Sequence, residues 1–408
     1  MDILFLPVGT AGDVLPHLAL ARTMAARGHR VRVAANPLFV TPTPGVELVP
    51  LGTADEFLHL LSDPDLWHPW RSTAKLLHSV GELAEVQYEL AADNGQRGGL
   101  TIGGSLALGA RCAEEAHGIP YATLHLQPVA LWNPLDPPLV PGLMAPSWLP
   151  RSLVRVQMWI AERVVTDPLL NRALGPLRKR LGLPKAKRFM HWWHADGLSL
   201  ALFPSWFAAA ESGSHVRHTG FPLWTDSAAL PPELEQFLAQ GSPPVVITPG
   251  SGQRHAHREL SALIAAVQQL GRRGVVLTRF REHLPADLPD GVIHVPWAPL
   301  STLLPRAAAL VHHGGVGTTA HGLAAGVPQF ILPRAYDQPD NAARVERLGG
   351  GLHLNAARVT SERAIAVLER LLNDQRISAA CAGLRERIAA EDGLYAATNA
   401  LETYGSTR

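Results

Sequence analysis

The chain begins with a continuous apolar run, and apolar residues at helical spacing follow it. Residues 3–8 form an apolar run that ends at the sequence GTAG, and the apolar residues after it recur at helical spacing as far as Gly28. The residues that set this spacing are Val14, Leu18, Ala21 and Ala25. The sequence RVRVAAN then has the composition of a second strand. This order opens a doubly wound parallel sheet, whose ligands gather at the carboxyl ends of its strands, so we expect a functional edge at residues 9–17.

The same alternation returns after a proline-rich connection at residues 221–244. The apolar run VVIT ends at the turn PGSG, and further short runs follow in GVVLTRF, GVIHVPW, AALVHH and PQFILP. They predict a second doubly wound α/β domain facing the first across a central cleft. A chain of 408 residues also exceeds the roughly 250 to 300 residues at which single cores stop growing. We place the domains at residues 1–222 and 223–390, with a C-terminal helix at residues 391–408 that packs back on the first domain.

Composition narrows the class of protein. The formal charge of +1 gives no basic field for nucleic acid, so we expect no nucleic-acid partner. Cys112 and Cys381 are far apart and form no CxxC pair, which argues against a disulfide framework or a thiolate zinc site. The N-terminus has no basic region of a signal peptide, and no apolar run reaches the ~18 residues of a membrane span. These features predict a cytoplasmic protein and leave peripheral contact with the inner face of the membrane open.

The sequence VHHGGVGTTAHGLAAGVP, residues 311–328, has the features of a phosphate-binding turn. A strand ends near His312, glycines follow it, and a helix starts near Thr318. Glycines let backbone amides approach an anion closely, and the positive end of the helix dipole favours it. The run lacks the GK[ST] of a Walker loop and the GxGxxG of a dinucleotide fingerprint. We expect it to bind a diphosphate; the structural alternative is a tight turn with a buried, satisfied His312.

Flanking motifs give this stretch a family resemblance. The pattern WAP…HHGGVGTT…GVP…DQPDNA, together with the opening GTAGDVLPHLALARTMAARGHRV, resembles the family 1 inverting glycosyltransferases of the two-domain GT-B fold. The resemblance covers nearly the whole chain. The sequences GSLALGARCAEEAHGIPY, LFPSWFA and TGFPL are most similar to bacterial rhamnosyltransferases of the rhamnolipid type, with sterol and antibiotic glycosyltransferases as more distant relatives.

The resemblance implies a donor site in the second domain. Trp297 would stack on the nucleobase and the Ala298 backbone would read its edge, although core packing is the alternative for Trp297. The diphosphate would be held by His313, Gly315, Gly317 and Thr318, with Ser251 closing on it. Asp337 and Gln338 would bind the sugar hydroxyls, because a carboxylate and an amide together accept and donate hydrogen bonds. No metal is required if the helix end and His313 carry the diphosphate.

The first strand-to-helix turn offers the base that the reaction needs. An acceptor hydroxyl attacks only as it loses its proton, and Asp13 lies at the turn where it could take that proton. His17, one helical turn further, could contact the acceptor or orient Asp13. Many family members have a histidine near this turn, whereas the antibiotic and rhamnolipid types have Gly-Asp-Val, as this chain does. The structural alternative for Asp13 is capping of the helix.

The same resemblance predicts the substrates. Members that use uridine donors commonly have a glutamate eight residues after the phosphate-binding histidine, and here that position is His321. We therefore expect no cofactor but a nucleotide-sugar donor, dTDP-L-rhamnose. For the acceptor we expect an amphipathic hydroxyalkanoate, because eight of ten tryptophans fall between Trp67 and Trp206 and residues 133–150 carry six prolines among apolar residues. The predicted acceptor-binding residues are Trp67, Trp132, Leu139 and Leu143. A partner enzyme that supplies the acceptor fits this interpretation.

Three other functions remain as alternatives, and two more are disfavoured. A sterol, macrolide or other natural-product aglycone could replace the lipid, and a sugar-nucleotide epimerase or a non-catalytic nucleotide-sugar binding protein could have the same fold. A nicotinamide-dependent dehydrogenase is disfavoured, because Asn36 stands where a ribose-binding acid would be expected. A glycosidase needs two opposed carboxylates, and the sequence singles out no such pair.

Overall fold

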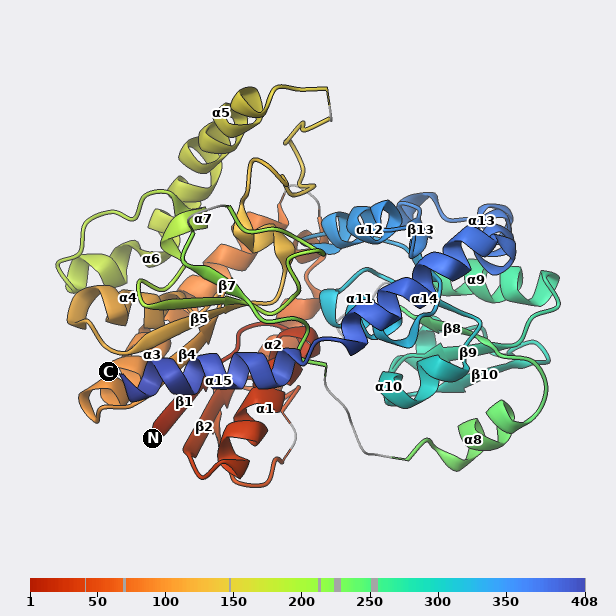
Figure 1. The fold of residues 1–408 in the computed structure, drawn as a ribbon, viewed down its shortest axis with the longest axis horizontal. Coiled ribbons are helices and arrows are strands. Elements are labelled where there is room, and N and C mark those ends of the chain that lie inside the picture. The colour runs from red at the N-terminus through yellow and green to blue at the C-terminus, as the bar shows by residue number, and fades with distance from the viewer. Residues whose placement is uncertain are drawn as a thin grey trace. The chain divides into compact units, whose positions relative to one another are not determined.

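The computed structural model describes residues 1–40, 42–68, 71–146, 148–211, 214–223, 229–250 and 256–407. It divides into two compact units, which are Met1–Pro222 with Asp392–Arg408, and Leu223–Glu391. Each unit is built around its own parallel β-sheet (Figure 1). The prediction of two doubly wound α/β domains is thereby confirmed at the level of the fold.

Unit 1 contains a seven-stranded sheet in the order β3-β2-β1-β4-β5-β6-β7. Its strands are β1 (Asp2–Leu6), β2 (Arg30–Ala35), β3 (Val46–Pro50), β4 (Leu100–Gly104), β5 (Tyr121–His125), β6 (Leu198–Ala201) and β7 (Val216–His218). Its helices are α1 (Ala11–Ala26), α2 (Ala54–Ser62), α3 (Ser72–Gln96), α4 (Leu108–His117), α5 (Arg151–Ala161), α6 (Asp167–Arg180), α7 (Phe189–Trp192) and α15 (Gly393–Ser406). Short 3-10 helices η1 (Pro64–Trp67) and η2 (Pro128–Leu131) and the π-helix η3 (Glu162–Thr166) complete it.

Unit 2 contains a six-stranded sheet in the order β10-β9-β8-β11-β12-β13. Its strands are β8 (Val245–Thr248), β9 (Gly274–Leu277), β10 (Val292–Val295), β11 (Ala309–His312), β12 (Gln329–Ile331) and β13 (Gly351–His353). Its helices are α8 (Pro232–Ala239), α9 (His257–Gln269), α10 (Leu300–Leu303), α11 (Val316–Ala325), α12 (Gln338–Arg347), α13 (Ser361–Asn373) and α14 (Gln375–Ala389). The 3-10 helices are η4 (Arg281–His283), η5 (Leu304–Arg306) and η6 (Ala356–Arg358).

The order of the strands places a topological switch point in each sheet. In unit 1 the chain moves outward from β1 in one direction and then returns to place β4 on the other side of β1. In unit 2 the same reversal occurs between β8 and β11. Ligands of doubly wound sheets bind at the carboxyl ends of the strands beside such a point. The turns after β1, β8 and β11 are therefore the places to look for a site.

The central strands of both sheets are largely buried because helices cover both faces of a parallel sheet. All five residues of β5 are buried, as are the last four of β1. Helix α15 returns to unit 1 from the far end of the sequence and packs against α1 (Figure 1). There Glu402 accepts hydrogen bonds from Arg27 at 2.5 Å and from His29 at 2.8 Å.

Candidate functional site

Asp13 lies in the first turn of α1, directly after the switch-point strand β1. Its Oδ2 accepts a hydrogen bond from the Thr10 backbone N–H at 2.8 Å, and the Thr10 hydroxyl lies 3.4 Å away. This is the reciprocal arrangement of a capping box, so Asp13 does have the capping role that the sequence left as an alternative. This bond occupies Oδ2 and leaves Oδ1 to another partner.

Gly9 makes the space for this carboxylate. Its φ of 137° is a conformation that other residues rarely adopt, and a Cβ atom on Gly9 would collide with the Asp13 carboxyl group. A side chain at this position would therefore move Asp13 out of the turn. The glycine of the GTAG sequence is required for the position of the candidate base.

Gln127 holds the second oxygen of Asp13. It lies two residues beyond the end of β5, and its Nε2 donates to Asp13 Oδ1 at 2.9 Å. Burial raises the pKa of Asp13 to about 6, although the bonds from Thr10 and Gln127 act in the opposite direction. A carboxylate with this pKa is ionised at neutral pH and is a stronger base than an ordinary aspartate. We name Gly9, Thr10, Asp13, His17 and Gln127 the Asp13 site.

His17 does not touch the Asp13 carboxylate. Its ring is fully buried, and its Nδ1 donates to the backbone carbonyl of Asp13 at 2.8 Å. Burial lowers the pKa of His17 to about 4, so the ring is neutral. Its Nε2 is buried and has no hydrogen-bond partner among the described residues. The hydrogen bond to the Asp13 carbonyl links His17 to the first turn of α1. The sequence predicted that His17 contacts the acceptor or orients Asp13, and the ring has no exposed surface through which to contact an acceptor.

A second polar chain that the sequence did not single out lies at the same edge of this sheet. Ser105 follows β4, and its Oγ lies 2.9 Å from Nδ1 of His125, the last residue of β5. The Nε2 of His125 is 2.8 Å from Nδ1 of His194. Burial lowers the pKa of both histidines, to about 4 for His194, so the chain is uncharged. Its hydroxyl end is half-buried and is available for a polar substrate group.

The structure brings some of the predicted acceptor residues together. Trp132 is buried in an apolar cluster against which Leu143 packs, together with residues of α3, α5 and α6. Trp67 instead donates its Nε1 hydrogen to the Leu61 carbonyl at 3.1 Å, and Leu139 is 47% exposed. Trp132 has a left-handed backbone with φ 44°, and its buried Nε1 has no partner among the described residues. The indole therefore retains an unused donor inside the cluster.

In unit 2, the predicted phosphate-binding turn lies between β11 and α11. Helix α11 begins at Val316 with Gly315 as its N-cap, two residues earlier than Thr318. It ends at Ala325, and Gly326 is its left-handed C-cap. Gly317 and Thr318 therefore lie in the first turn, where backbone amides have no partner within the helix. Those amides and the helix dipole favour an anion at this point. We name residues 313–318 the anion loop.

The two histidines at the start of this turn have different environments. His312 is buried and uses both nitrogens: Nδ1 accepts from the Gly314 N–H at 3.1 Å, and Nε2 donates to Gln329 Oε1 at 2.9 Å. His313 is half-buried, and its Nδ1 has no partner among the described residues. Burial, and after it the charge of Arg334, lower the pKa of His313 to about 4. The satisfied histidine is thus His312, whereas the buried Nδ1 of His313 has no partner among the described residues.

Glycines on both sides leave the space that the His313 ring occupies. A Cβ atom on Gly250 would lie 2.6 Å from the ring, and one on Gly315 would lie 2.5 Å from its Nε2. Gly314 has a φ of 95°, and a Cβ there would approach the Gln338 carbonyl to 3.0 Å. In contrast, a Cβ on Gly317 would meet no atom within 4 Å. Gly250, Gly314 and Gly315 are therefore required by the structure of the loop itself. No such requirement exists at Gly317, where the absence of a side chain would matter only to a ligand that approaches the backbone.

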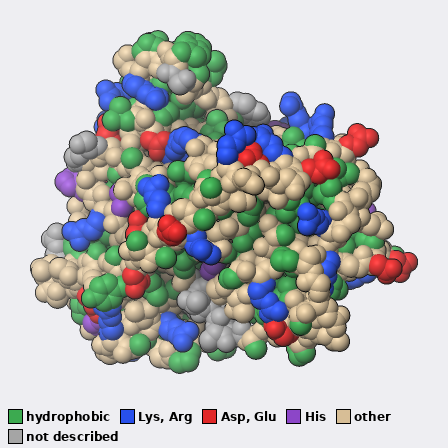
Figure 2. All heavy atoms as spheres, turned by 45° about the vertical axis from the view of Figure 1, so that its right-hand side comes forward, with side chains coloured by type: hydrophobic (Ala, Val, Ile, Leu, Met, Phe, Trp, Pro, Cys, Tyr) green, Lys and Arg blue, Asp and Glu red, His purple; other side chains and the backbone are tan. Residues whose placement is uncertain are grey.

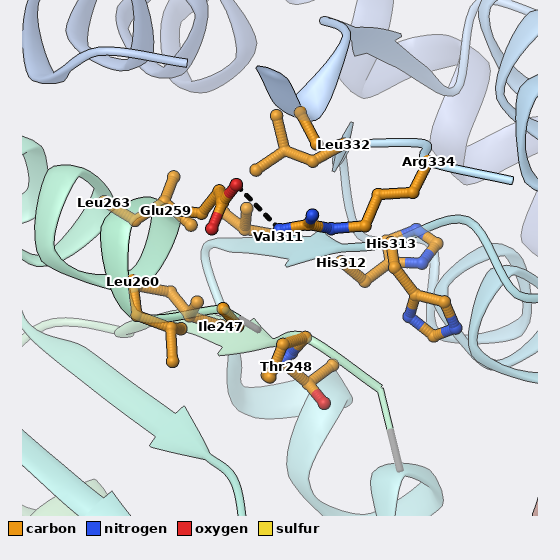
Figure 3. Close-up of a pocket in the computed structure, with 13 residues that line it drawn as sticks. Ile247, Thr248, Glu259, Leu260, Leu263, Val311, His312, His313, Leu332 and Arg334 are labelled. Atoms are coloured by element: carbon orange, nitrogen blue, oxygen red, sulfur yellow. Dashed lines mark ion pairs between the residues drawn. The ribbon is translucent and has the colours of Figure 1, made fainter. Parts of the chain in front are cut away.

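A charged pair stands beside the loop, over a hollow lined mainly by apolar residues (Figure 3). Arg334 donates to Glu259 at 2.7 Å, and the Arg334 side chain lies near His313 in the close-up. Ile247, Leu260 and Val311 line the hollow below the pair. Arg334 thus places a guanidinium group, paired with Glu259, next to the anion loop.

Asp337, Gln338 and Asn341 connect the predicted sugar-binding loop to the anion loop. Asn341 is fully buried, and its Nδ2 donates to the Gly314 carbonyl at 2.9 Å and to Asp337 Oδ2 at 2.7 Å. The amide oxygen of Gln338 accepts from the Arg334 N–H at 2.9 Å, which leaves its N–H groups for a ligand. Asn341 belongs to the DQPDNA motif, but its linking role could not be read from the sequence.

The remaining predicted donor residues are Trp297, Ala298 and Ser251. Trp297 is 46% exposed after β10, as a stacking surface requires and a core residue does not, whereas Ala298 is buried with only its backbone to offer. Ser251 lies outside the described residues. No group of three or more His, Cys, Asp or Glu side chains in the described part of the chain could hold a metal ion.

Comparisons with known families agree with this division of the chain. Residues 3–131 match the glycosyltransferase family 28 N-terminal domain. Residues 261–395 match the C-terminal domain of the family described as erythromycin biosynthesis protein CIII-like. The first match covers the Asp13 site, and the second covers the anion loop.

Known relatives extend over the whole chain. The O-mycaminosyltylonolide 6-deoxyallosyltransferase of Streptomyces fradiae is 30% identical over 100% of this chain and 98% of its own. The glycosyltransferase GtfE of Amycolatopsis orientalis is 30% identical over 91% of this chain and 90% of its own.

Solved structures show the same fold. The glycosyltransferase VinC in complex with dTDP matches with a TM-score of 0.69 and 22% identity over 100% of both chains. The spinosyn rhamnosyltransferase SpnG matches with a TM-score of 0.69 and 20% identity over 99% of this chain and 100% of its own. The chain therefore belongs to the erythromycin biosynthesis protein CIII-like glycosyltransferases of the GT-B fold, and it is a glycosyltransferase.

Proposed function

We propose that this glycosyltransferase transfers L-rhamnose from dTDP-L-rhamnose to a hydroxyl of a lipid-like hydroxyalkanoate, with inversion at the anomeric carbon. Unit 1 would bind the acceptor and unit 2 the donor. The observation that carries the chemical part of this proposal is the carboxylate of Asp13, whose pKa is raised to about 6 at a switch-point strand end. The identity of nucleotide, sugar and acceptor rests on further residues.

The proposed reaction is a single displacement. Asp13 takes the proton of the acceptor hydroxyl while the hydroxyl oxygen forms a bond to the anomeric carbon. The bond from that carbon to the nucleotide phosphate oxygen breaks, and the nucleoside diphosphate leaves with the electron pair. Amides of the anion loop, the His313 ring and Arg334 would stabilise the negative charge on the leaving group.

The choice of nucleotide follows from His321. The residue lies on α11, three and four positions after Thr318 and Gly317, and therefore on the same helix face as the anion loop. Burial lowers the pKa of His321 to about 4, so it presents a neutral ring where a carboxylate would bind the ribose hydroxyls of a uridine donor. The relatives support a dTDP-deoxysugar, since one was solved with dTDP and two others are named for transfer of 6-deoxyallose and rhamnose.

Titration of dTDP and UDP into the protein tests the nucleotide. A ligand at a hundred times its Kd stabilises a protein by about 2.7 kcal/mol, so thermal shifts give a first ranking and calorimetry gives the affinities. We expect dTDP to bind more tightly, and we expect His321→Glu to reduce the difference by adding an acceptor for a 2′-hydroxyl. A clear preference of the unmodified protein for UDP would contradict the proposal.

The choice of acceptor follows from the apolar surroundings of Trp132 and Leu143. Each buried methylene contributes roughly 0.8 kcal/mol, so an alkyl chain could bind there without specific polar contacts. The second candidate is a natural-product aglycone. Two names favour it: the O-mycaminosyltylonolide 6-deoxyallosyltransferase, and a sterol 3-beta-glucosyltransferase of Arabidopsis thaliana that is 27% identical over 99% of this chain and 68% of its own. Transfer to hydroxy-fatty acids of graded chain length, assayed beside a macrolide and a sterol, separates the two. Transfer rates that do not change with the chain length of the fatty acid, or reaction of the rigid aglycones alone, would favour the second candidate.

A further inference from the structure

Helix α5 and the π-helix η3 expose an unusual number of large apolar side chains. Their exposed fractions lie between 47% for Ile160 and 67% for Val164. We name this set the α5 face, and it consists of Leu153, Val156, Trp159, Ile160, Val164 and Val165. Scattered apolar residues are normal on a protein surface, but a contiguous group on one short segment marks an interaction site.

The exposed residues are not the ones that hold α5 on the protein. Val154 and Met158, one helical turn apart, are buried in the apolar cluster of unit 1. Leu153, Val156 and Ile160 follow each other at intervals of three and four residues and so share a different side of the helix. The α5 face is therefore additional to the packing of the fold, and polar substitutions there leave the buried side intact.

The preceding loop is fastened to the same helix. The backbone N–H of Met144 donates to Gln157 Oε1 at 3.2 Å, and Gln157 Nε2 donates to the Met144 carbonyl at 3.1 Å. Met144 is 66% exposed and Trp148 is 74% exposed. The loop thus adds two large apolar side chains to the segment that carries the α5 face.

Positive charge is concentrated in the part of the chain that contains this segment. Residues 137–188 contain ten lysines and arginines against two acidic residues, a net charge of +8 in a chain whose total is +1. Both acidic residues, Glu162 and Asp167, are buried. All the basic residues except Arg178 are exposed; the exposed ones are Arg151, Arg155, Arg163, Arg172, Lys179, Arg180, Lys185, Lys187 and Arg188.

Acidic residues elsewhere in unit 1 offset only part of this charge. Arg155 lies 3.6 Å from Glu211, Arg178 is paired with Glu115, and Arg180 is paired with Glu85. The charge that remains after these three pairs is still strongly positive. Figure 1 shows α5 projecting from unit 1, and in Figure 2 hydrophobic side chains gather on this projection, with basic side chains beside its base.

We propose that the α5 face docks on the surface of an anionic lipid bilayer. Its apolar side chains, together with Trp148 of the preceding loop, would enter the boundary between headgroups and acyl chains, while the arginines and lysines contact the anionic headgroups. A projecting segment that combines both features fits a bilayer better than a protein partner, whose interface requires a shape-complementary surface with paired polar groups. No helix of the described residues is long and apolar enough to cross a membrane, so the contact is peripheral.

Sedimentation with lipid vesicles tests this inference. The full chain is mixed with vesicles of phosphatidylglycerol and phosphatidylcholine in equal parts, and separately with vesicles of phosphatidylcholine alone. We expect binding to the mixed vesicles that weakens with added salt, and binding at least about tenfold weaker to the uncharged ones. Equal binding to both, or none to the mixed vesicles, overturns the proposal.

Two sets of variants locate the contact. Leu153→Ser with Trp159→Ser removes apolar contact, and Val86→Ser, a substitution on the 44% exposed Val86 of α3, is its matched control. We expect the double variant to lose about tenfold or more in affinity for mixed vesicles and the control to lose nothing. Melting curves of both variants report folding. Unchanged binding by a folded double variant contradicts the proposal.

The charge variants follow the same design. Arg151→Gln with Arg163→Gln should weaken binding to mixed vesicles about tenfold, whereas Arg22→Gln with Arg370→Gln, two exposed arginines outside the segment, should not. Size-exclusion chromatography of the unmodified chain shows whether the α5 face is used in another way. A dimer that dissociates in the Leu153→Ser and Trp159→Ser variant, without vesicle binding, would assign the face to a protein contact instead.

Discussion

The Asp13 site and the anion loop differ in the charge of their own groups. The Asp13 site places an ionisable side chain at a partly buried position, where desolvation raises the pKa of the carboxyl group to about 6. The anion loop places neutral groups, namely helix amides and a histidine whose pKa burial lowers to about 4, around the position of a charged ligand. The first arrangement suits the proposed proton transfer, whereas the second suits the proposed binding of an anion.

This difference explains where each site requires glycine. Gly9 is needed because the Asp13 side chain occupies the space beside it. Gly250 and Gly315 are needed because the His313 ring lies between them, but Gly317 borders open space. The Asp13 site is therefore complete in itself, while the bare backbone at Gly317 has a purpose only when a ligand is bound. Predictions for the two sites can be separated on this basis.

The largest effect should come from Asp13→Asn. The amide can still accept the Thr10 N–H, but it cannot take a proton, so turnover should fall by about two to four orders of magnitude. Donor affinity should be nearly unchanged, because the groups proposed to bind the donor lie in the anion loop. Steady-state kinetics with a titration of the nucleotide diphosphate measures both quantities. Turnover close to that of the unmodified enzyme would remove Asp13 as the base.

A smaller effect is expected for Gly317→Ala. The methyl group has free space in the unliganded protein and alanine favours a helix, so the variant should fold normally. It should nevertheless bind the donor roughly ten- to hundredfold more weakly, because the methyl group keeps a phosphate away from the amides. Gly175→Ala on α6, where a Cβ also meets no atom within 4 Å, is the control and should leave affinity unchanged. Equal affinity in the two variants would speak against the anion loop.

The dependence of the rate on pH provides the next test. The pKa of Asp13 is raised to about 6, so its basic form is lost as the pH falls through 6, and the rate should then drop about tenfold per pH unit. Gln127→Leu removes a donor that stabilises the carboxylate, so the midpoint should move to higher pH. Profiles of kcat for both proteins measure the shift. A profile that is flat between pH 5 and 7 would be incompatible with this base.

The smallest effect concerns stability. The pKa of Asp13 is higher in the folded protein than its ordinary value of 3.8, so ionisation of Asp13 destabilises the fold above pH 6 and no longer does so near pH 4. Asp13→Asn should therefore melt at the same temperature as the unmodified protein or slightly higher at pH 8, and this advantage should disappear at pH 4. Melting curves at the two pH values check it. A large loss of stability at pH 8 would mean that the carboxylate is mainly a cap.

The sequence predicted the two sheets and the turn after β11, because strands and glycine turns have recognisable local sequence patterns. Two doubly wound sheets followed from apolar runs and turns, and the turn after β11 could be located from the glycines that follow His312. The start of α11 was predicted near Thr318, whereas Gly315 caps it, because glycine can cap a helix as threonine does.

The partners of these residues could not be predicted, since they are distant in the sequence. Gln127 reaches Asp13 across 114 positions of the chain, and Asn341 reaches Gly314 across 27. Apolar periodicity carries no information about such side-chain contacts. The same limit applies to Trp67 and Trp132, which composition grouped together but which have different neighbours in the structure.

The most direct test of the account is a comparison of Asp13→Asn, Gly317→Ala and the double variant in one assay that measures both donor Kd and kcat. If one site is reactive and the other binds, the double variant will combine the Kd of Gly317→Ala with the kcat of Asp13→Asn, because the two effects are independent. If instead Asp13→Asn weakens donor binding as much as Gly317→Ala does, or Gly317→Ala lowers kcat as much as Asp13→Asn does at saturating donor, the division between the two sites is contradicted.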